Sequence, residues 1–317
     1  MRSIRIASRP SKLALAQTHM IKEALQALCP DLDISVVRIS TKGDKDGTAF
    51  LYKSQSQGLF TSEVEGALLD RRADVAVHSL KDLPTVSPAE LTVAALPKRD
   101  SPGDALVTTY PVGGIRDLPT CATVGTSSLR RMAQIKHARD DLRCVPLRGN
   151  VETRLAKVAS GQVDAAIMAC AGLNRLGLAD RISAVLPIEE FLPAPAQGAL
   201  AVQVRRDDTA LVDLISQLDD PDTRLAVEIE RHVLAAMHSG CSIPLGVYAH
   251  LENDTITLDA MISDVEGKHY IRRTRTTSRS QALTAAAELA AELLDAGGRQ
   301  ILRHIRGTDQ ISIADSQ

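Results

Sequence analysis

The sequence predicts an α/β protein made of two similar α/β units and a smaller α+β unit, and three observations support this fold class. Short β-rich runs alternate with helical patterns over residues 3–77, and the alternation returns over residues 121–169. Proline-rich segments at 96–103 and 191–198 flank the second unit. From residue 245 onward, strand-like runs follow one another directly before a last helix.

The first unit has a β-α-β-α-β rhythm. Its expected elements are a strand at 3–8, a helix at 11–28, a strand at 33–39, a helix at 60–71 and a buried strand at 73–77. Because a helix connects each strand to the next, the sheet is expected to be mostly parallel, with helices on its faces.

The second unit begins near residue 103 and repeats this style. Its expected elements are strands at 121–124, 143–147 and 163–169, helices at 127–138 and 151–159, and a short helix after the last strand. The two proline-rich segments could form a hinge of two strands, after which the chain returns to the first unit. Such a topology places a cleft between the two units.

The last unit combines a helix, three strands and a second helix. The first helix is expected at 223–237, after Pro221, with Asp222 or Thr223 as its cap. Strands are expected at 245–251, 255–262 and 268–276, and the final helix at 281–296, capped by Ser280 and ended by Gly297. The expected domains are residues 1–98 together with 199–217, then 103–193, then 222–317.

Bulk composition argues against several classes of function. The net charge is −2 at pH 7, and the chain has no Trp, four Tyr and three Phe, which disfavours binding to nucleic acid or to a membrane surface. The five cysteines are odd in number and form no C-x-x-C pair, so we expect no disulfide framework, no zinc site and a reducing compartment. The absence of a signal peptide or long apolar run predicts a cytoplasmic protein. We expect four of the cysteines to be small buried hydrophobic side chains, namely Cys29, Cys121, Cys144 and Cys170.

Hydroxyl, amide and arginine side chains follow three expected strands, in the turns that open the next helices. These turns are 8–11, 125–131, and 148–150 with Arg154 one helical turn later. Helix N-termini and arginines both favour anions, and open α/β sheets bind ligands at the carboxyl ends of their strands. Each turn could instead be a capped helix with surface arginines. Arg130 and Arg131 oppose the helix dipole and repel each other, so an anion is expected to compensate them.

Two further segments carry reactive side chains. Residues 78–84 place Lys81 and Asp82 directly after a strand, where a carboxylate could stabilise positive charge or transfer a proton; the alternative is a surface ion pair. Cys241 lies beyond a helix C-terminus, whose dipole raises the pKa of a thiol. It therefore suits a covalent anchor better than a turnover nucleophile, and the alternative is a plain loop cysteine. No spacing of His, Cys, Asp or Glu indicates a metal site.

Eight segments together resemble the hydroxymethylbilane synthase (porphobilinogen deaminase) family, in the family's order and approximate spacing. They are IASRPSKLALAQ, GLF, ADVAVHSLKDLP, VGTSSLRR, LRGNVETRL, AGLNRLGL, LPAPAQGAL and SGCSIPLG. The resemblance implies two domains similar to type II periplasmic binding proteins around a cleft, and a small α+β third domain. It also implies a monomeric transferase that joins four molecules of its substrate, porphobilinogen, head to tail with loss of ammonia. The implied product is linear 1-hydroxymethylbilane for porphyrin and haem biosynthesis, and the implied cofactor is a dipyrromethane attached to Cys241.

The same motifs imply roles for individual residues. Asp82 is the implied catalytic residue, because a carboxylate can stabilise the positive charge that departing ammonia leaves on a pyrrole ring. The implied cofactor-binding residues are Cys241, Lys81, Ser127, Ser128, Arg130 and Arg131. The implied substrate-binding residues are Arg9, Ser11, Arg148, Arg154, Arg175, Gln197 and Lys53. The chain departs from the family at Gln57, where lysine is usual, at Ser62, where a charged residue is common, and at Ala196, where glycine is common.

Two alternatives belong to other classes of protein. A non-catalytic binder of small dicarboxylates on the same two-lobed scaffold would account for the arginine turns and the cleft, but not for Asp82, the third unit or Cys241. A DNA-binding regulator would need a helix-turn-helix segment, which the sequence does not show.

Overall fold

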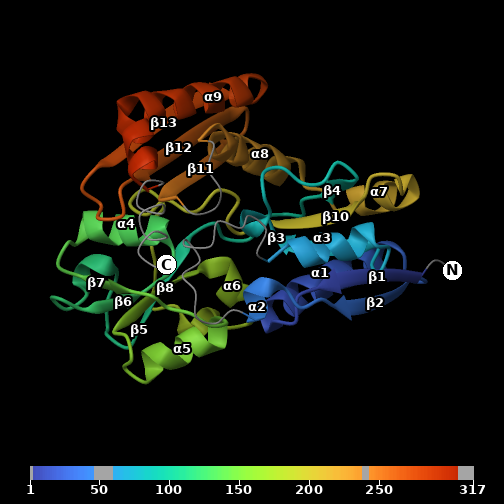
Figure 1. The fold of residues 1–317 in the computed structure, drawn as a ribbon, viewed down its shortest axis with the longest axis horizontal. Helices are drawn as coiled ribbons and strands as arrows, with labels where there is room; N and C mark the ends of the chain where they lie inside the picture. The colour runs from blue at the N-terminus through green and yellow to red at the C-terminus, as the bar shows by residue number, and fades with distance from the viewer. Residues whose placement is uncertain (1–2, 46–59, 238–242, 306–317) are drawn as a thin grey trace, which may run out of the picture.

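The computed structural model describes residues 3–45, 60–237 and 243–305, and it contains three β-sheets (Figure 1). A five-stranded sheet and its helices form the first lobe, on the right of Figure 1. A second five-stranded sheet and its helices form the second lobe, at the lower left, and a three-stranded sheet with two long helices forms the third unit, at the top. Among the residues of these ranges, no helix is long and apolar enough to cross a membrane.

The sheet of the first lobe has the strand order β2-β1-β3-β10-β4. Strand β1 runs parallel to β2 and β3, whereas β10 runs antiparallel to β3 and β4. The strands are β1 (Ser3–Ser8), β2 (Asp33–Arg38), β3 (Val75–Ser79), β4 (Leu91–Ala95) and β10 (Leu200–Arg205). The helices of this lobe are α1 (Lys12–Leu28), α2 (Lys42–Lys45), α3 (Ser62–Leu69) and α7 (Thr209–Ser216).

The sheet of the second lobe repeats this pattern in the order β7-β6-β8-β5-β9. Strand β6 runs parallel to β7 and β8, and β5 runs antiparallel to β8 and β9. The strands are β5 (Asp104–Thr108), β6 (Thr123–Gly125), β7 (Arg143–Val145), β8 (Ala165–Ala169) and β9 (Ala184–Val185). The helices are α4 (Leu129–Ala138), α5 (Val151–Ala159) and α6 (Cys170–Arg175).

The expectation of mostly parallel sheets is therefore confirmed for the first three strands of each sheet and wrong for the rest. In each sheet the fourth strand, β10 or β5, enters from the other lobe and runs antiparallel to both of its neighbours. A helical crossover within one sheet keeps successive strands parallel, but a strand that arrives from elsewhere has no such constraint.

Apolar side chains of helices and sheets form a separate core in each lobe. In the first lobe, Ile21 and Leu25 of α1 are buried with Ile4, Ile6 and Val202 from the sheet. The helical spacing of the α1 residues and the alternation along β1 are what place these side chains on the facing surfaces.

In the second lobe, Ile135 of α4 packs with Leu106, Val124 and Ile167 from the sheet. All four side chains are buried, with exposed fractions of 1% or less. This packing holds α4, whose second and third residues are Arg130 and Arg131, against the sheet.

The third unit consists of α8 (Pro221–Ala236), β11 (Leu245–Glu252), β12 (Thr255–Ser263), β13 (Tyr270–Ser278) and α9 (Ala282–Leu293). Its three strands form an antiparallel sheet in chain order, and the two helices bury Val233 and Leu289 against Val247 and Leu258. The strands and helices thus fall where the sequence predicts them, within a few residues.

Three predicted helix ends in this unit are wrong. Asp220, not Asp222 or Thr223, caps α8, because its side chain accepts the Thr223 N–H at 2.7 Å and Pro221 is tolerated as the first helical residue. Ser280 does not cap α9, because a short 3-10 turn over 279–281 precedes that helix. Gly297, with φ of 123°, produces a kink rather than an end, and helical residues continue to 305.

The two segments that connect the lobes, 96–103 and 191–198, are called here the crossing segments. They lie side by side: the Asp100 N–H donates to the Gly198 oxygen at 3.3 Å. Gly198 has φ of 89°, and a Cβ atom there would lie 2.6 Å from the Asp100 oxygen, so only glycine fits this close approach. Strand β10 follows the second crossing segment, so the chain returns to the first sheet as the sequence predicts.

Glu230 of α8 ties both crossing segments to the third unit. Its carboxylate is fully buried and accepts hydrogen bonds from Arg99 at 2.7 and 3.0 Å and from the Ala249 N–H of β11 at 3.0 Å. It also accepts the Ala196 N–H at 2.6 Å. Ala196 has φ of 61°, a left-handed conformation that costs roughly 1–2 kcal/mol for a residue other than glycine, and the contact with Glu230 holds it there.

The turn between β12 and β13 docks on the last turn of α4. The His137 ring stacks on Tyr270 with a centroid distance of 4.0 Å, and its Nδ1 lies 3.1 Å from the Gly267 oxygen. Gly267 has φ of 70°, and a Cβ atom there would lie 2.5 Å from the His137 nitrogen and 2.6 Å from the Ala133 oxygen. The third unit therefore contacts the second lobe through a backbone that has no room for a side chain.

Gly267→Ala is expected to destabilise the protein by about 3 kcal/mol, because left-handed strain adds to a steric clash with the α4 backbone. Gly161→Ala is the matched control, since Gly161 has φ of 71° but nothing within 4 Å of its added Cβ atom. The control is expected to cost only about 1 kcal/mol. Urea denaturation measures both values, and equal losses would show that the docked turn contributes nothing.

Candidate active site

The turns after the parallel strands of both lobes meet where the lobes meet. Carboxyl ends of parallel strands lie at one edge of a sheet, so side chains that follow different strands come together there. The side chains in question are Arg9 and Ser11 after β1, Lys81 and Asp82 after β3, Ser127 and Ser128 after β6, Arg148 after β7, and Arg175 on the helix after β8. We call the group of Lys81, Asp82, Asp104, Arg130, Arg131, Arg148 and Arg154 the cationic centre.

Asp104, the first residue of β5, is a carboxylate of this centre that belongs to none of the sequence motifs. It is fully buried and forms ion pairs with Arg131 at 2.6 Å and Arg130 at 2.8 Å. Burial alone would raise the pKa of Asp104, but the charges of Arg130 and Arg131 outweigh burial and hold this pKa well below its usual range. The chain itself thus supplies part of the negative charge that the sequence predicts beside Arg130 and Arg131. An aspartate at the head of the apolar run Ala105–Val107 is the signal that could have revealed it.

Even with Asp104, the cationic centre has more cations than carboxylates: five against two. Burial and the nearby charge of Arg131 lower the pKa of Lys81 to about 8, although Asp82 and Asp104 oppose this shift. Burial, Arg131 and Arg148 likewise lower the pKa of Arg154 to about 10. These shifts show that Lys81 of the first lobe and the arginines of the second lobe interact electrostatically. An anionic ligand would reduce the repulsion among these cations.

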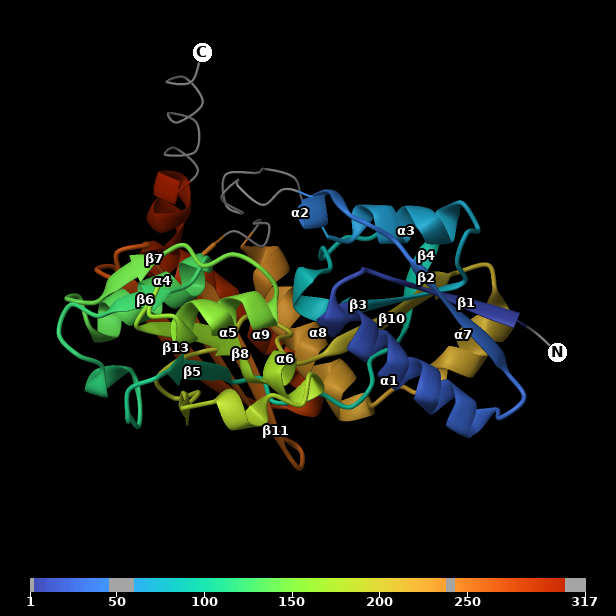
Figure 2. The ribbon, with the colours of Figure 1, turned by 90° about the horizontal axis from the view of Figure 1, so that it is seen from below.

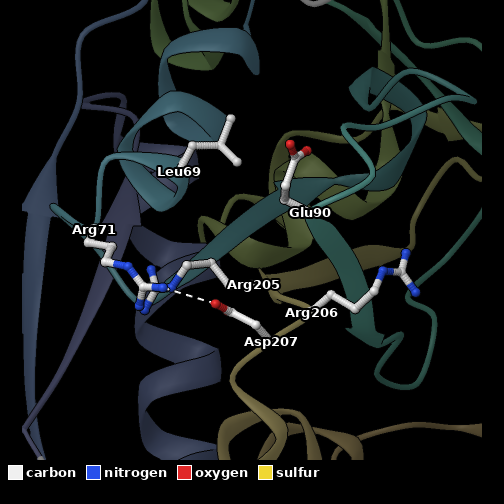
Figure 3. Close-up of a pocket in the computed structure, with 6 residues that line it drawn as sticks. All are labelled: Leu69, Arg71, Glu90, Arg205, Arg206 and Asp207. Atoms are coloured by element: carbon white, nitrogen blue, oxygen red, sulfur yellow. Dashed lines mark hydrogen bonds and ion pairs between the residues drawn. The ribbon is translucent and has the colours of Figure 1, made fainter.

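A hollow of about 390 Å³ at the opposite edge of the first sheet provides a contrast (Figure 3). Arg71 there pairs with Asp207 at 2.9 Å. Arg205 donates to Asp74 and to two carbonyl oxygens, and Arg206 donates to the Ala89 and Leu91 oxygens. Three carboxylates, those of Asp74, Glu90 and Asp207, accompany these three arginines, so this hollow lacks the excess of positive charge found at the cationic centre.

Asp82 lies on a tightly held turn directly after β3. The turn is the 3-10 segment Leu80–Asp82, and the Leu80 N–H donates to the Ala199 oxygen at 3.0 Å. From the third unit, Arg231 donates to the Leu83 oxygen at 2.9 Å and to the Pro84 oxygen at 2.6 Å. Asp82 itself is half-buried, so its carboxylate is positioned by the backbone on both sides and remains accessible. No local sequence pattern points to Arg231, because its partners lie about 150 residues away in the chain.

Lys81 connects the first lobe to the second crossing segment. Its Nζ donates to Gln197 Oε1 at 3.2 Å, and Gln197 Nε2 donates to Asp104 at 2.9 Å and to the Pro102 oxygen at 2.8 Å. Gln197 is almost fully buried, so its amide bridges the lysine to the buried aspartate.

Two of the predicted serines cap helices, and the third holds the backbone of a neighbouring segment. Ser11 caps α1 by accepting the Ala14 N–H at 3.3 Å, and Ser128 caps α4 by accepting the Arg131 N–H at 3.4 Å. Ser127 Oγ donates to the Leu147 oxygen at 3.1 Å and accepts the Leu147 N–H at 3.2 Å. These contacts place the two lobe helices with their N-termini directed at the site.

The remaining arginines lie in three different places. Arg148 and Arg154 belong to the cationic centre, and Arg154 Nε donates to the Gly149 oxygen at 2.9 Å. Arg9 lies over the Phe60 ring, 4.3 Å from its centroid. Arg175 lies instead at the crossing segments, where it donates to the Gly198 oxygen at 2.5 Å and lies 3.8 Å from Asp100.

Several predicted residues cannot be placed or are placed differently. Cys241, Lys53 and Gln57 lie outside the described residues. The expected burial of the other cysteines holds for Cys170 but is wrong for Cys121, which is exposed at a left-handed turn with φ of 60° before β6. Within the described ranges, no group of three His, Cys, Asp or Glu side chains could hold a metal ion.

A buried polar network lies beneath the Asp82 turn. His78 of β3 is 5% exposed, its Nε2 lies 3.0 Å from Gln203 Oε1, and Gln203 Nε2 donates to Glu65 at 2.9 Å. Burial lowers the pKa of His78 to about 4, against the opposing effect of the Gln203 hydrogen bond.

The free energy of unfolding is therefore expected to fall as the pH drops from about 6.5 to about 4, by about 3 kcal/mol from His78 alone. The sign follows because the unfolded histidine, with its pKa near 6.5, binds the proton more readily than the buried one. Urea denaturation between pH 7 and pH 4 measures this loss. His78→Gln should show a smaller loss over the same range, and an unchanged pH dependence would contradict the assignment.

Two α/β lobes that face each other across an excess of arginine and lysine are the arrangement expected of a protein class that binds anionic organic molecules. Residues 4–213 match the family model described as "Porphobilinogen deaminase, dipyromethane cofactor binding domain", and residues 224–295 match "Porphobilinogen deaminase, C-terminal domain". The chain belongs to the porphobilinogen deaminase family.

Curated relatives agree with this assignment over nearly the whole chain. The porphobilinogen deaminase of Syntrophobacter fumaroxidans is 44% identical over 304 residues, which cover 96% of this chain and 98% of the relative. That of Roseiflexus castenholzii is 45% identical over 300 residues, covering 95% and 98%. The chain is thus a transferase of tetrapyrrole biosynthesis with a dipyrromethane cofactor-binding domain.

Solved structures of lower similarity include two-lobed binding proteins. The methionine-binding protein MetQ is 11% identical, covers 70% of this chain and 92% of its own, and has a TM-score of 0.44. The periplasmic VFT2 domain of Bordetella pertussis BvgS is 18% identical, covers 68% and 86%, and has a TM-score of 0.38. At such low scores, neither likeness bears on function.

Proposed function

We propose that this chain performs the hydroxymethylbilane synthase reaction with the cationic centre as its site. Four porphobilinogen molecules are joined head to tail, with loss of ammonia each time, onto a dipyrromethane attached to Cys241, and water then releases linear 1-hydroxymethylbilane. The observation that carries this proposal is the excess of cations around Asp82, which suits a product with two carboxylates on every ring.

The residues of the cationic centre fit a dipyrromethane. The cofactor presents carboxylates, and the centre presents guanidinium and ammonium groups that outnumber its own acids. Arg130 Nε is buried and has no hydrogen-bond partner within the described part of the chain, and the same holds for Arg175 Nε. When bound, the dipyrromethane supplies the pyrrole carbon to which the first substrate is joined.

Each side chain has a proposed task in binding. The cofactor carboxylates are held by Lys81, Arg130 and Arg131, with Ser127 and Ser128 keeping the start of α4 in place. The substrate carboxylates are held by Arg9, Arg148 and Arg154, with Ser11 at the start of α1 and Lys53 as a further cation. Arg175 and Gln197 position the crossing segments and, through them, Asp104 and Lys81.

Asp82 is the proposed catalytic residue. Its carboxylate accepts the pyrrole N–H of the bound substrate and stabilises the positive charge that develops on the ring as ammonia leaves. The same oxygen takes the proton released when the new bond between rings forms. Lys81 and Arg154 lie close enough to interact with this carboxylate, and the fixed turn keeps it in position without reorganisation.

Three further features belong to this proposal. The first domain comprises residues 1–98 and 199–217, the second 103–193 and the third 222–317, so that the cofactor cysteine and the cationic centre lie on different domains. We propose that the protein acts as a monomer in the cytoplasm, without nucleic-acid or membrane partners. Size-exclusion chromatography with light scattering tests the monomer, and a dimer mass would contradict it.

Cys241→Ser is expected to lose the covalent primer, because a serine oxygen does not form the stable thioether. Intact mass spectrometry of denatured protein measures this: the parent chain carries a dipyrrole adduct and the variant carries none. Cys121→Ser is the matched control, since Cys121 is exposed yet distant in the sequence from the proposed anchor. An adduct that persists in Cys241→Ser would overturn the anchor assignment, whereas the control is expected to keep its adduct.

The same measurement decides between the synthase and a non-catalytic binder of dicarboxylates. A binder would show the bare chain mass and would release no ammonia from porphobilinogen. The synthase is expected to show the adduct and to release ammonia and a bilane. The family match already favours the synthase.

A further inference from the structure

Lys12 and Glu152 form an ion pair that joins the two lobes away from the crossing segments. Lys12 is the first residue of α1 in the first lobe, and Glu152 is the second residue of α5 in the second lobe. Lys12 Nζ lies 3.0 Å from Glu152 Oε1. Figure 2 shows α1 and α5 on either side of α6, where the lobes approach each other.

The dipoles of α1 and α5 explain why Lys12 pairs with Glu152. A cation at a helix N-terminus opposes the helix dipole, so Lys12 is unfavourable within its own helix. An anion at the same position is favourable, so Glu152 stabilises the start of α5. The hydrogen bond of the Glu152 carboxylate with its own backbone N–H, together with Lys12, outweighs burial and lowers the pKa of Glu152 below its usual range. The favourable partner of Lys12 therefore comes from the opposite lobe.

The pair lies beside a direct contact between α1 and α6. A Cβ atom on Gly172 of α6 would lie 3.7 Å from a methyl carbon of Leu13 of α1, so these helices are in contact. The Lys12 side chain is 75% exposed and that of Glu152 is 34% exposed. Exposed pairs are weak and screened by salt, so this contact can break and re-form as the lobes move.

We propose that Lys12 and Glu152 are a salt-sensitive latch, which holds the two lobes together at their junction. When the lobes separate, Lys12 is released beside Ser11 and Arg9, and Glu152 is released beside Arg148 and Arg154. The latch thus sets the balance between closed and open lobes by a contact independent of the crossing segments.

A double-mutant cycle on the full chain tests the latch. Fluorescent donor and acceptor groups are attached to p-acetylphenylalanine introduced at two exposed positions, Met20 on α1 and Ala159 on α5. Single-molecule energy transfer then gives the ratio of open to closed molecules for the parent, Lys12→Gln, Glu152→Gln and the double variant. Glu152→Gln also weakens the start of α5, so the cycle is needed to isolate the pair.

At low salt, each single substitution is expected to raise the open-to-closed ratio about two- to fivefold. The double variant should open no further than the singles, and about 1 M sodium chloride, where the screening length is roughly 3 Å, should bring the parent to the same ratio. Arg71→Gln is the matched control, because Arg71 pairs with Asp207 within the first lobe, and it should leave the ratio unchanged.

Unchanged ratios in both single variants, or strictly additive effects in the cycle, would overturn the latch. The measurement needs no substrate and no turnover. A failed latch would therefore leave the proposed reaction untouched, and loss of the Cys241 adduct would leave the latch untouched.

Discussion

Asp82→Asn is expected to lower turnover about a hundredfold to ten-thousandfold, the usual contribution of a positioned proton-transfer group. Asparagine has the same shape but carries no negative charge, so it can neither stabilise a positively charged pyrrole ring nor accept a proton. The turn itself should survive, because the contacts that hold it involve its backbone and not the Asp82 side chain. The Leu80 N–H donates to the Ala199 oxygen, and Arg231 donates to backbone oxygens of the turn.

Steady-state release of ammonia from porphobilinogen measures this effect, and thermal unfolding checks that the fold is intact. Asp207→Asn is a suitable control, because that aspartate pairs with Arg71 at the far edge of the first sheet. Turnover in Asp82→Asn within tenfold of the parent would remove Asp82 from its proposed role.

Asp104→Asn is expected to destabilise the protein by about 3–5 kcal/mol, because breaking a buried ion pair leaves its partner charge uncompensated. Here two guanidinium groups lose their buried carboxylate, and Gln197 loses an acceptor. The pKa of Asp104, held low by Arg130 and Arg131, shows how strongly the native state favours the charged form.

Urea denaturation measures the loss of stability in Asp104→Asn. Asp295→Asn provides the comparison, since Asp295 pairs with Arg299 on an exposed helix surface and should cost less than about 1 kcal/mol. A similar small loss at both positions would mean that Asp104 does not compensate the arginines. Protection of the variant by added porphobilinogen would further show that ligand carboxylates can replace the missing charge.

Local periodicity predicted most of the fold. The helix expected at 151–159 is α5 without a shift, and the strands expected at 3–8 and 33–39 are β1 and β2 within one residue. The strands β4, β5 and β10 were not assigned, because each is a short apolar run that periodicity alone cannot distinguish from a buried loop or helix. The antiparallel direction of β10 depends on partners more than a hundred residues away, so no local pattern carries it.

The candidate site divides in the same way. Lys81, Asp82, Arg130, Arg131 and Arg148 follow strand ends, so their residue types and positions revealed them. Asp104, Glu230 and Arg231 act through contacts with residues far away in the chain, and their own neighbours in the sequence look like ordinary helix or strand. The sequence therefore predicts which side chains bind the proposed anionic ligand. The structure adds the residues that hold those side chains in position.

The position of β10 in the first sheet affects how the chain can be assembled during synthesis. The second sheet is built from one continuous stretch, 104–185, whereas the first sheet lacks its fourth strand until residue 205 has left the ribosome. Until then β3 and β4 have no common neighbour, and their edges stay open to wrong pairing. The N-terminal lobe is thus the later one to mature, and slow translation beyond β9 would lengthen the time during which chaperones must protect it.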